Sequence, residues 1–319
     1  MTDRSFEALL DESSRGVPKR GMRTGEVPLR AKALQSFSSL PPAVQAEPAP
    51  ERSRTPTRPD LARDGAADVP AVLAPNAVDD VWRNLPRVTF DPRHLERHRI
   101  IAATREDPAH STFDVLRTRL LRTLKENGWT RVAITSPTKD CGKSFLAANL
   151  ALSLSRAERV RTVLMDLDLR NPSLDKTLGV EQPGVLRRFL SGKVTVREQF
   201  RRFAENDLGA GQNLAFALNE RIEAHPAELL LAPSTDEALA AMQEQLRPDV
   251  VLYDLPPALY YDDVIAFQRH VDGVLLVIGG GVTRAEDVNE VSRRLGKDNP
   301  LLGVVLNKAE GASIRHYYY

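Results

Sequence analysis

Residues 132–144 read Val-Ala-Ile-Thr-Ser-Pro-Thr-Lys-Asp-Cys-Gly-Lys-Ser, and this stretch decides the fold of the chain. A short apolar strand, residues 132–134, runs into a loop that closes on the tripeptide Gly-Lys-Ser. Apolar, helix-forming residues 145–154 follow directly. A strand, a loop ending in Gly-Lys-Ser and a helix in this order are typical of a phosphate-binding loop.

The residue types of this loop suit an anion. Backbone N–H groups of the loop and of the first helical turn point at one place, where the helix dipole adds roughly half a positive charge. Lys143 is expected to neutralise the β- and γ-phosphates of a nucleotide, and the Ser144 hydroxyl to bind Mg²⁺. Pro137 stands where the usual motif has its first glycine. Because proline fixes φ and donates no hydrogen bond, the loop has to enter its turn by another backbone route.

Composition divides the chain into a tail and an ordered domain. Residues 1–95 carry twelve of the 22 prolines without sustained periodicity, which predicts a disordered Pro-rich tail. Within it, residues 5–10 (Ser-Phe-Glu-Ala-Leu-Leu) are either a short partner-binding helix or an apolar stretch of tail. The expected domains are this tail, an ATPase domain over residues 96–316, and a tyrosine cluster over residues 317–319.

The remaining composition excludes some partners. The formal charge is +1, from 44 basic and 43 acidic residues, so neither nucleic acid nor direct binding to an anionic membrane surface is expected. The single cysteine excludes an intramolecular disulfide, which suits a reducing cytoplasm. The polar start of the chain lacks the hydrophobic region of a signal peptide, and no apolar run approaches the ~18 residues of a membrane span. A cytoplasmic location is expected, with any membrane role acting through a partner.

Apolar strands alternate with helical patterns from residue 111 onward. A helix is predicted over residues 111–127 and another over Ala285–Leu295, from apolar positions at helical spacing. The segment 173–245 is expected to cap the sheet with helical patches and turns. The predicted strands are residues 132–134, 161–165, 250–253, 274–278 and 302–306. Buried strands alternating with helices predict an α/β fold, a doubly wound and mostly parallel sheet of the P-loop NTPase type. Its ligand should bind at the carboxyl ends of the strands.

Aspartates follow two of these strands. Asp166 and Asp168 end the second strand, and Asp254 ends the third. A single strand-end aspartate is more often a turn former or helix cap. Two such strand ends, together with the strand end that carries Lys143 and Ser144, instead match what Mg²⁺ and a nucleotide triphosphate need. Asp166 and Asp168 are expected to face one side, one near the metal and one near an incoming hydroxyl.

The motifs resemble those of the bacterial tyrosine kinases of capsule and exopolysaccharide synthesis, which lie within the MinD/ParA-like P-loop ATPases. The resemblance covers about residues 95–319. It rests on the phosphate loop, on Val-Leu-Met-Asp-Leu-Asp-Leu-Arg at residues 163–170, on Val-Leu-Tyr-Asp-Leu-Pro-Pro at residues 251–257, and on three closing tyrosines. The pattern Asp-x-Asp-x-Arg is its most specific part.

The resemblance implies roles for particular residues. Lys143, Asp166, Asp168 and Arg170 take part in catalysis, with the base for the tyrosine hydroxyl left open between Asp166 and Asp168. Mg²⁺ is held by Ser144, Asp166 and Asp254. The residues implied in binding ATP are Thr138, Lys139, Asp140, Cys141, Gly142, Lys143, Ser144, Phe145 and, at the adenine, Asn307. For Cys141, a small side chain filling a tight loop is a better explanation than a redox switch.

The resemblance also implies acceptors and partners. Tyr317, Tyr318 and Tyr319 would accept phosphate, offered to a neighbouring subunit. A transmembrane polysaccharide co-polymerase would activate the kinase and recruit it to the inner face of the membrane. A homo-oligomer is implied, but its ring form stays open: where the family's subunit-contact helix reads Glu-x-x-Arg-x-x-Arg, this chain has Ser111, Asp114 and Arg117.

Two alternative functions remain from the sequence. One is a MinD/ParA-type ATPase, a nucleotide-driven dimer switch without kinase activity. Such ATPases usually carry a lysine at the position of Thr138, whereas Lys139 lies one residue away. The other is a nucleotide-binding scaffold without turnover, which Pro137 would favour.

Overall fold

The computed structural model describes residues 75–103, 110–297 and 299–309. Within these ranges one sheet of eight strands runs in the order β1-β4-β5-β3-β6-β2-β7-β8. Every neighbouring pair is parallel except the antiparallel pair of β4 and β5. The strands are β1 (Arg87–Val88), β2 (Arg131–Thr135), β3 (Thr162–Asp166), β4 (Arg201–Phe203), β5 (Leu214–Ala217), β6 (Val250–Asp254), β7 (Gly273–Gly279) and β8 (Leu301–Asn307).

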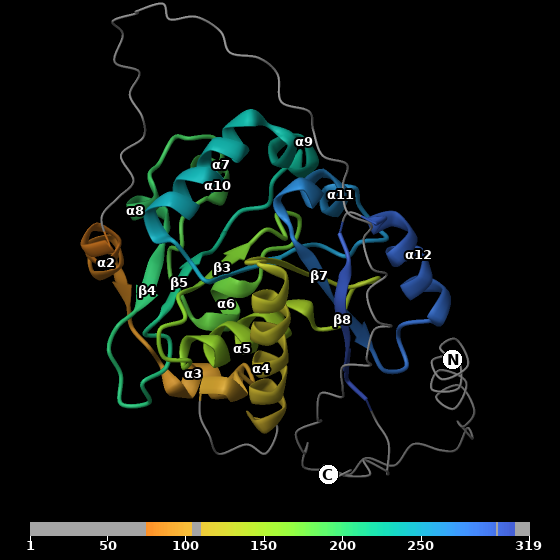
Figure 1. Cartoon of the computed structure of the whole chain (residues 1–319), viewed down its shortest axis with the longest axis horizontal. Coiled ribbons are helices and arrows are strands. Elements are labelled where there is room, and N and C mark those ends of the chain that lie inside the picture. The colour runs from red at the N-terminus through yellow and green to blue at the C-terminus, as the bar shows by residue number, and fades with distance from the viewer. Residues whose placement is uncertain (1–74, 104–109, 298, 310–319) are drawn as a thin grey trace, which may run out of the picture.

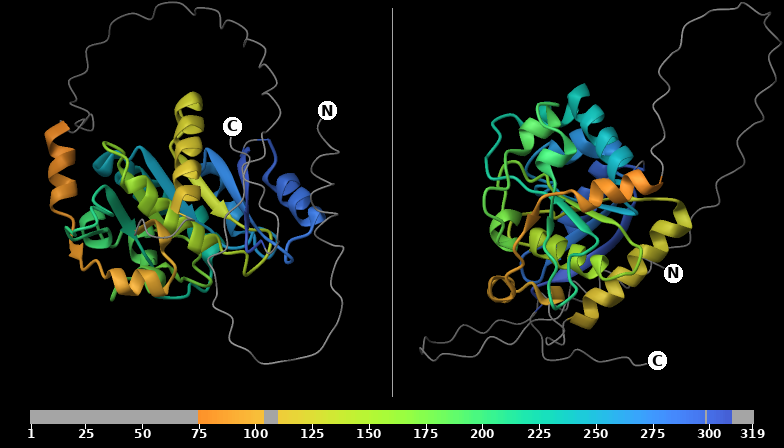
Figure 2. Two further views of the ribbon diagram at one scale, coloured as in Figure 1. Left: turned by 90° about the horizontal axis from the view of Figure 1, so that it is seen from below. Right: turned by 90° about the vertical axis from the view of Figure 1, so that its left-hand side faces the viewer.

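Helices cover both faces of this sheet (Figures 1 and 2). The first face is covered by α3 (Pro92–Arg97), α4 (His110–Asn127), α5 (Lys143–Ser155), α6 (Leu174–Leu178) and the short 3₁₀ helix η1 (Ile101–Ala103). The second face is covered by α2 (Pro75–Arg83), α7 (Leu186–Leu190), α8 (Val196–Gln199), α9 (Pro226–Leu231), α10 (Pro233–Leu246), α11 (Asp263–Phe267) and α12 (Ala285–Leu295). A second 3₁₀ helix, η2 (Gln268–His270), follows α11.

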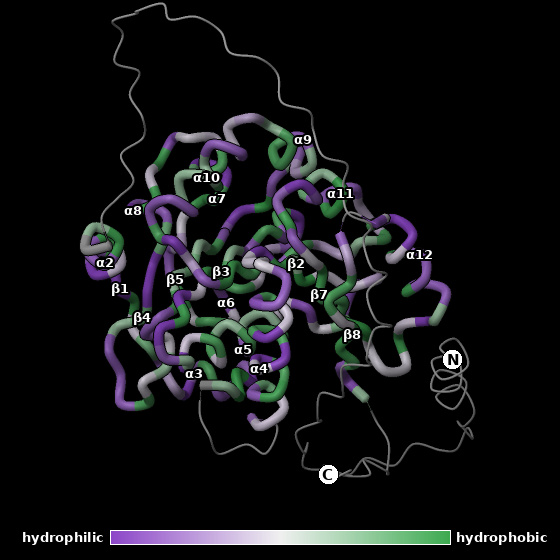
Figure 3. Tube along the Cα trace, viewed as in Figure 1, coloured by the Kyte–Doolittle hydropathy of each residue, from purple (hydrophilic) through white to green (hydrophobic). Residues whose placement is uncertain are grey.

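Alternation along each strand divides the hydrophobic core into two halves. In β2, Val132 and Ile134 belong to the core half under α4 and α5, whereas Ala133 belongs to the half under α10 and α11. Since successive strand residues point to opposite faces, a strand that is apolar at every position must be covered on both sides. The central strands are accordingly largely hydrophobic along their length, while α12 is largely hydrophilic (Figure 3).

The predicted doubly wound fold is confirmed. The five strands expected from the sequence are β2, β3, β6, β7 and β8, each within two residues of its expected bounds, and α12 spans Ala285–Leu295 as predicted. The helix predicted from residue 111 is α4, which buries Phe113, Leu116, Leu120 and Leu124 on one face. Apolar spacing was sufficient to locate these elements because each buries a continuous stripe or run.

Two expectations about the fold were wrong. Order does not begin near residue 95, because α2 and β1 precede it: Val78 and Trp82 are buried, and the Trp82 indole donates to the Leu246 carbonyl at 2.8 Å. Segment 173–245 does not merely cap the sheet, since it contributes β4 and β5. Strands as short as these give too few positions for a periodic pattern. The expected disorder of residues 1–74 lies outside the described residues.

Candidate active site

The phosphate loop, residues 136–144, joins β2 to α5. Pro137 is buried at its start, and its carbonyl accepts a hydrogen bond from the backbone N–H of Leu259 at 3.2 Å. The turn is made further on, where Asp140 and Gly142 have positive φ angles of 62° and 89°. These left-handed residues are the alternative backbone route that Pro137 requires, and they bring the chain to the N-terminus of α5.

Asn307, at the end of β8, holds this turn from outside. Its Nδ2 donates to the carbonyl of Cys141 at 3.0 Å. A Cβ atom on Gly142 would lie 2.1 Å from that same Nδ2, so only glycine fits. The sequence resemblance implied an adenine contact for Asn307. That contact stays a prediction, and in the described structure the amide group contacts the phosphate loop next to where the loop enters α5.

Cys141 fills the interior of the loop. Its thiol is fully buried, with Thr138 Oγ1 at 3.6 Å and Thr283 Oγ1 at 3.5 Å. Thr283 in turn accepts a hydrogen bond from the backbone N–H of Gly279 at the end of β7. The packing interpretation of Cys141 therefore matches its surroundings better than a reactive, exposed thiol.

Lys143 connects the loop to carboxylates at the ends of β6 and β3, the next two strands of the sheet. Its ammonium Nζ lies 2.5 Å from Asp168 Oδ2 and 3.7 Å from Asp254 Oδ1, and its side chain is 12% exposed. Burial lowers the pKa of Lys143, but the charges of Asp254 and Asp168 outweigh burial and the net shift is upward. The lysine is thus a charged group held between two acidic residues.

Asp254 and Asp166, which end adjacent strands β6 and β3, are completely buried. Within the described ranges, neither oxygen of Asp254 accepts a hydrogen bond, and Oδ1 of Asp166 accepts none. Burial raises the pKa of Asp254 to about 6, against the opposing charge of Lys143. Burial and the charge of Asp254 raise the pKa of Asp166 as well. Buried carboxylate oxygens that accept no hydrogen bond are suited to a cation.

This arrangement fits Mg²⁺ rather than a metal enclosed by protein. Among the described residues, no group of three or more His, Cys, Asp or Glu side chains forms a protein-only metal site. Mg²⁺ usually takes one or two carboxylates and completes its shell with waters and substrate phosphates. Asp254, Asp166 and the Ser144 hydroxyl at the start of α5 supply such a partial set of ligands.

Asp168 lies beyond the end of β3, in the aspartate loop (residues 167–172). Its Oδ1 accepts the backbone N–H of Asn171 at 3.0 Å, while Oδ2 binds Lys143. Asp166, still in the strand, accepts backbone N–H groups at the start of α6 through Oδ2. The two aspartates therefore do not continue one strand face as expected, and they have different surroundings.

The other predicted residues lie around this centre. Arg170 is turned to α11, where it pairs with Asp263 rather than with the Lys143 cluster. Lys139 and Asp140 are exposed at the rim of the loop. The Phe145 ring packs against Phe113 with ring centroids 6.1 Å apart, so its side chain belongs to the core. The three terminal tyrosines lie outside the described residues.

Sequence reasoning missed the importance of Asp263. It stands six residues after Pro257, where the stretch quoted in the sequence analysis ends, and its side chain is fully buried. The signal was the second member of an Asp-Asp pair at the start of a helix. Two adjacent aspartates at the start of a helix are usually explained by their favourable interaction with the helix dipole. The pattern therefore did not indicate that one of them is buried.

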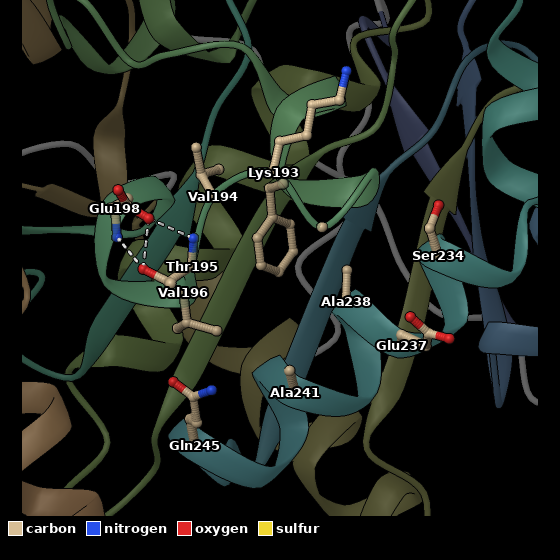
Figure 4. A pocket seen from close by; sticks show the side chains of 12 residues that line it. Lys193, Val194, Thr195, Val196, Glu198, Ser234, Glu237, Ala238, Ala241 and Gln245 are labelled. Atoms are coloured by element: carbon tan, nitrogen blue, oxygen red, sulfur yellow. Dashed lines mark hydrogen bonds between the residues drawn. The ribbon is translucent and has the colours of Figure 1, made fainter.

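A separate cavity of about 320 Å³ lies between the turn after α7 and helix α10 (Figure 4). Its floor is apolar, with Phe189, Val196 and Ala238. Thr195 and Glu198 on its rim bond each other in the capping box of α8. No residue predicted to act in catalysis lines this cavity.

Comparison with known proteins identifies the class. The model of the CobQ/CobB/MinD/ParA nucleotide binding domain matches residues 132–318, more than half of the chain. The chain belongs to this family of nucleotide-binding domains. The match begins at β2 and includes the phosphate loop and all three aspartates described above.

Within that class, the similar proteins are tyrosine kinases, as the sequence resemblance predicted. The chain is 28% identical over 214 residues to the putative tyrosine-protein kinase EpsB of Ralstonia nicotianae, covering 67% of this chain and 27% of EpsB. It is 28% identical over 222 residues to the tyrosine-protein kinase YwqD of Bacillus subtilis, covering 69% of this chain and 90% of YwqD. The chain thus spans about a quarter of the length of EpsB but most of YwqD.

Solved structures give the same likeness. The VpsO kinase domain shares 30% identity with a TM-score of 0.53, covering 62% of this chain and 95% of that domain. The BceF tyrosine kinase domain shares 26% identity with a TM-score of 0.56, covering 73% of this chain and 97% of that domain. In the described ranges of this chain, no helix is both long and apolar enough to cross a membrane.

Proposed function

We propose that this chain is an ATP-dependent protein tyrosine autokinase that regulates exopolysaccharide or capsule synthesis and export. The observation that carries the proposal is the contact of Lys143 with Asp168, 2.5 Å apart, beside the buried carboxylate of Asp254, whose oxygens accept no hydrogen bond from the described residues. A phosphate-binding lysine, a candidate base and a candidate metal ligand thus meet at the carboxyl ends of three adjacent strands. The likeness to tyrosine kinases, rather than to switch ATPases alone, supports tyrosine as the acceptor.

In this mechanism Lys143 exchanges one anion for another. When a nucleotide enters, the lysine leaves Asp168 and neutralises the β- and γ-phosphates. Backbone N–H groups of the loop and of the α5 N-terminus bind the remaining phosphate oxygens. Ser144, Asp166 and Asp254 would hold Mg²⁺, which neutralises charge on the transferred phosphoryl group.

Release of Lys143 also frees Asp168. Its Oδ2 then has no cation, and it can accept the proton of a tyrosine hydroxyl as that oxygen attacks the γ-phosphate. Asp166 is less suited to this role because its Oδ2 already accepts two backbone N–H groups. We therefore assign the base to Asp168 and metal binding to Asp166.

The acceptors and partners follow from the family resemblance. Tyr317, Tyr318 and Tyr319 would be phosphorylated in trans within a homo-oligomer. A transmembrane polysaccharide co-polymerase would activate the cytoplasmic kinase and recruit it to the inner face of the membrane. On α4, Arg117 pairs with Asp114 at 2.7 Å and donates to Ser153. Since this arginine is already paired within its own chain, the subunit contact of this protein need not follow the family's ring pattern.

The test is purified protein with Mg·ATP, analysed for phosphotyrosine and for released phosphate. Phosphotyrosine on the protein, absent when Lys143 is replaced by methionine, supports the proposal. Released phosphate without phosphotyrosine would instead identify a MinD/ParA-type ATPase switch. If neither product forms, the remaining alternative is a nucleotide-binding scaffold without turnover.

A further inference from the structure

A buried ion pair lies just outside the proposed catalytic centre. Nε and Nη2 of Arg170 donate to the two carboxylate oxygens of Asp263, at 2.7 Å and 2.9 Å. Asp263 is fully buried at the start of α11, and Arg170 is partly exposed on the aspartate loop. Each oxygen of this buried carboxylate is satisfied by the same guanidinium group. Such a two-point contact fixes orientation as well as distance.

This pair completes the attachment of the aspartate loop. At its start, the backbone N–H of Leu167 donates to the carbonyl of Asp254 at 2.9 Å. In its middle, the carbonyl of Leu169 accepts the backbone N–H of Glu223 at 2.9 Å. Arg170 makes the third attachment, through a side chain rather than the backbone. Asp168 lies between the first two and is held by the whole set.

Aromatic contacts extend the connection across the rim of the site. The Arg170 guanidinium lies over the Tyr261 ring, 4.2 Å from its centroid. Tyr261 packs edge-to-face on Tyr260, and Lys139 of the phosphate loop lies over the Tyr260 ring at 5.7 Å. The aspartate loop and the phosphate loop therefore contact the same segment that follows β6. Cation–π contacts at partly exposed sites are weak, so they stabilise this connection only modestly.

We propose that Asp263 is a positioning residue for phosphoryl transfer, which acts through Arg170 to keep Asp168 in place after Lys143 has left it. The proposal rests on the proposed function. In the described structure Lys143 itself helps to hold Asp168, at 2.5 Å. Once the lysine binds phosphate this contact is lost, and the Arg170–Asp263 pair remains as a charged side-chain attachment of the loop, beside the buried side chains of Leu167 and Leu169. Asp263 should therefore matter for turnover more than for nucleotide binding.

Asp263→Asn is the first variant, because it keeps the shape of the side chain and removes its charge. Asp262→Asn is the matched control, because Asp262 is the adjacent residue. Its side chain is 78% exposed, and its Oδ1 lies 3.9 Å from Nη2 of Arg170. Arg170→Lys is the second variant, which keeps the cation but loses the two-point geometry. For each protein we measure phosphotyrosine turnover, released phosphate, Mg·ADP affinity by calorimetry and melting temperature.

The expected result is that Asp263→Asn and Arg170→Lys each lower turnover by about tenfold or more, with Mg·ADP affinity within about twofold of wild type. Asp262→Asn behaves as wild type. The double variant is no worse than either single variant, because both remove the same attachment. This split between turnover and affinity is one that a general loss of stability does not produce.

Two results would overturn the inference. One is wild-type turnover in folded Asp263→Asn protein. The other is an equal fall of turnover, affinity and melting temperature, which assigns Asp263 a structural role only. If wild-type protein makes no phosphotyrosine, the proposed function fails by itself. The comparison of variants is then made on released phosphate, so the two failures remain distinguishable.

Discussion

The ammonium group of Lys143 and the carboxylate of Asp168 form an ion pair 2.5 Å long in which the side chains are only 12% and 4% exposed. The lysine that should bind phosphate is therefore occupied by an acidic partner that follows β3, the next strand but one in the sheet. Nucleotide binding must displace that partner, so affinity and catalysis place opposite demands on Asp168.

Replacement of Asp168 by asparagine should separate these demands. Without the competing charge, Lys143 is released more easily, and Mg·ADP should bind as tightly as in wild type or up to about tenfold more tightly. Tyrosine phosphorylation should fall by about 100-fold or more, because the proposed base is lost. Calorimetry and a phosphotyrosine assay measure the two effects. Weaker binding in Asp168→Asn would contradict the exchange of partners described above.

Asp254 should make nucleotide binding and stability depend on pH. Its pKa in the folded protein is about 6, above its unfolded value of about 4. Between these two pH values the folded state binds more protons than the unfolded state, so the unfolding free energy falls as pH rises. Above pH 6 the folded protein carries the full cost of the buried, ionised carboxylate. Mg²⁺ needs the ionised form, so Mg²⁺-dependent ADP affinity should increase as pH rises through 6.

Asp254→Asn tests the sign of this effect. The cost of the buried charge is removed, so the variant should gain on the order of 2 kcal/mol in unfolding free energy relative to wild type at pH 8, and little at pH 4. Denaturant unfolding without nucleotide, at both pH values, measures the difference. Asp262→Asn is the exposed control. A gain at pH 4 that is as large as at pH 8 would disprove the linkage.

Gly142 should be required for the phosphate loop in a way that other left-handed glycines are not. Gly142→Ala places a methyl group 2.1 Å from the Asn307 amide at a φ of 89°. Gly192 is the matched control, with a φ of 68° and nothing within 4 Å of its added Cβ. Gly142→Ala should weaken Mg·ADP binding by more than about tenfold, whereas Gly192→Ala should cost only about 1 kcal/mol of stability. Equal affinities in the two variants would show that the loop tolerates the change.

Two truncations test where the folded domain begins. Removing residues 1–90 deletes α2 and β1, with buried Val78, Trp82 and Leu85. Loss of a buried tryptophan alone costs about 3–5 kcal/mol, so the melting temperature should fall by about 10 °C or more. Removing residues 1–74 should leave it within about 2 °C of the full chain. A similar melting temperature for both truncations would mean that α2 contributes little.

The sequence predicted the part of the fold that repeats a simple pattern. Strands β2, β3 and β6 are mostly apolar and are followed or ended by chemistry-bearing residues, so the meeting of these residues at one edge of the sheet followed from the rule for parallel sheets. The edge strand β1 has two residues, Arg87 and Val88. Such a short strand is defined by its partner in space and not by its own composition.

The meeting of the main candidate residues was predicted, but most of their contacts were not. Lys143, Asp168 and Asp254 meet as expected, because all three follow strands of one sheet edge. The turn of Arg170 toward Asp263 was not predicted, since it depends on how α11 packs after the chain leaves β6. Likewise, the contact of Asn307 with Cys141 joins residues 166 positions apart. Contacts of this range are determined by tertiary packing, which local patterns do not contain.

Phosphate transfer between subunits tests the central claim most directly. Lys143→Met protein, which cannot transfer phosphate but keeps Tyr317, Tyr318 and Tyr319, is mixed with protein whose three tyrosines are phenylalanine. With Mg·ATP, the account predicts phosphotyrosine on the tail of the Lys143→Met protein, and none on either protein incubated alone. Mass spectrometry of the C-terminal peptide gives the answer. Absence of phosphate on that peptide, while the mixture still hydrolyses ATP, would contradict the account and favour a MinD/ParA-type switch.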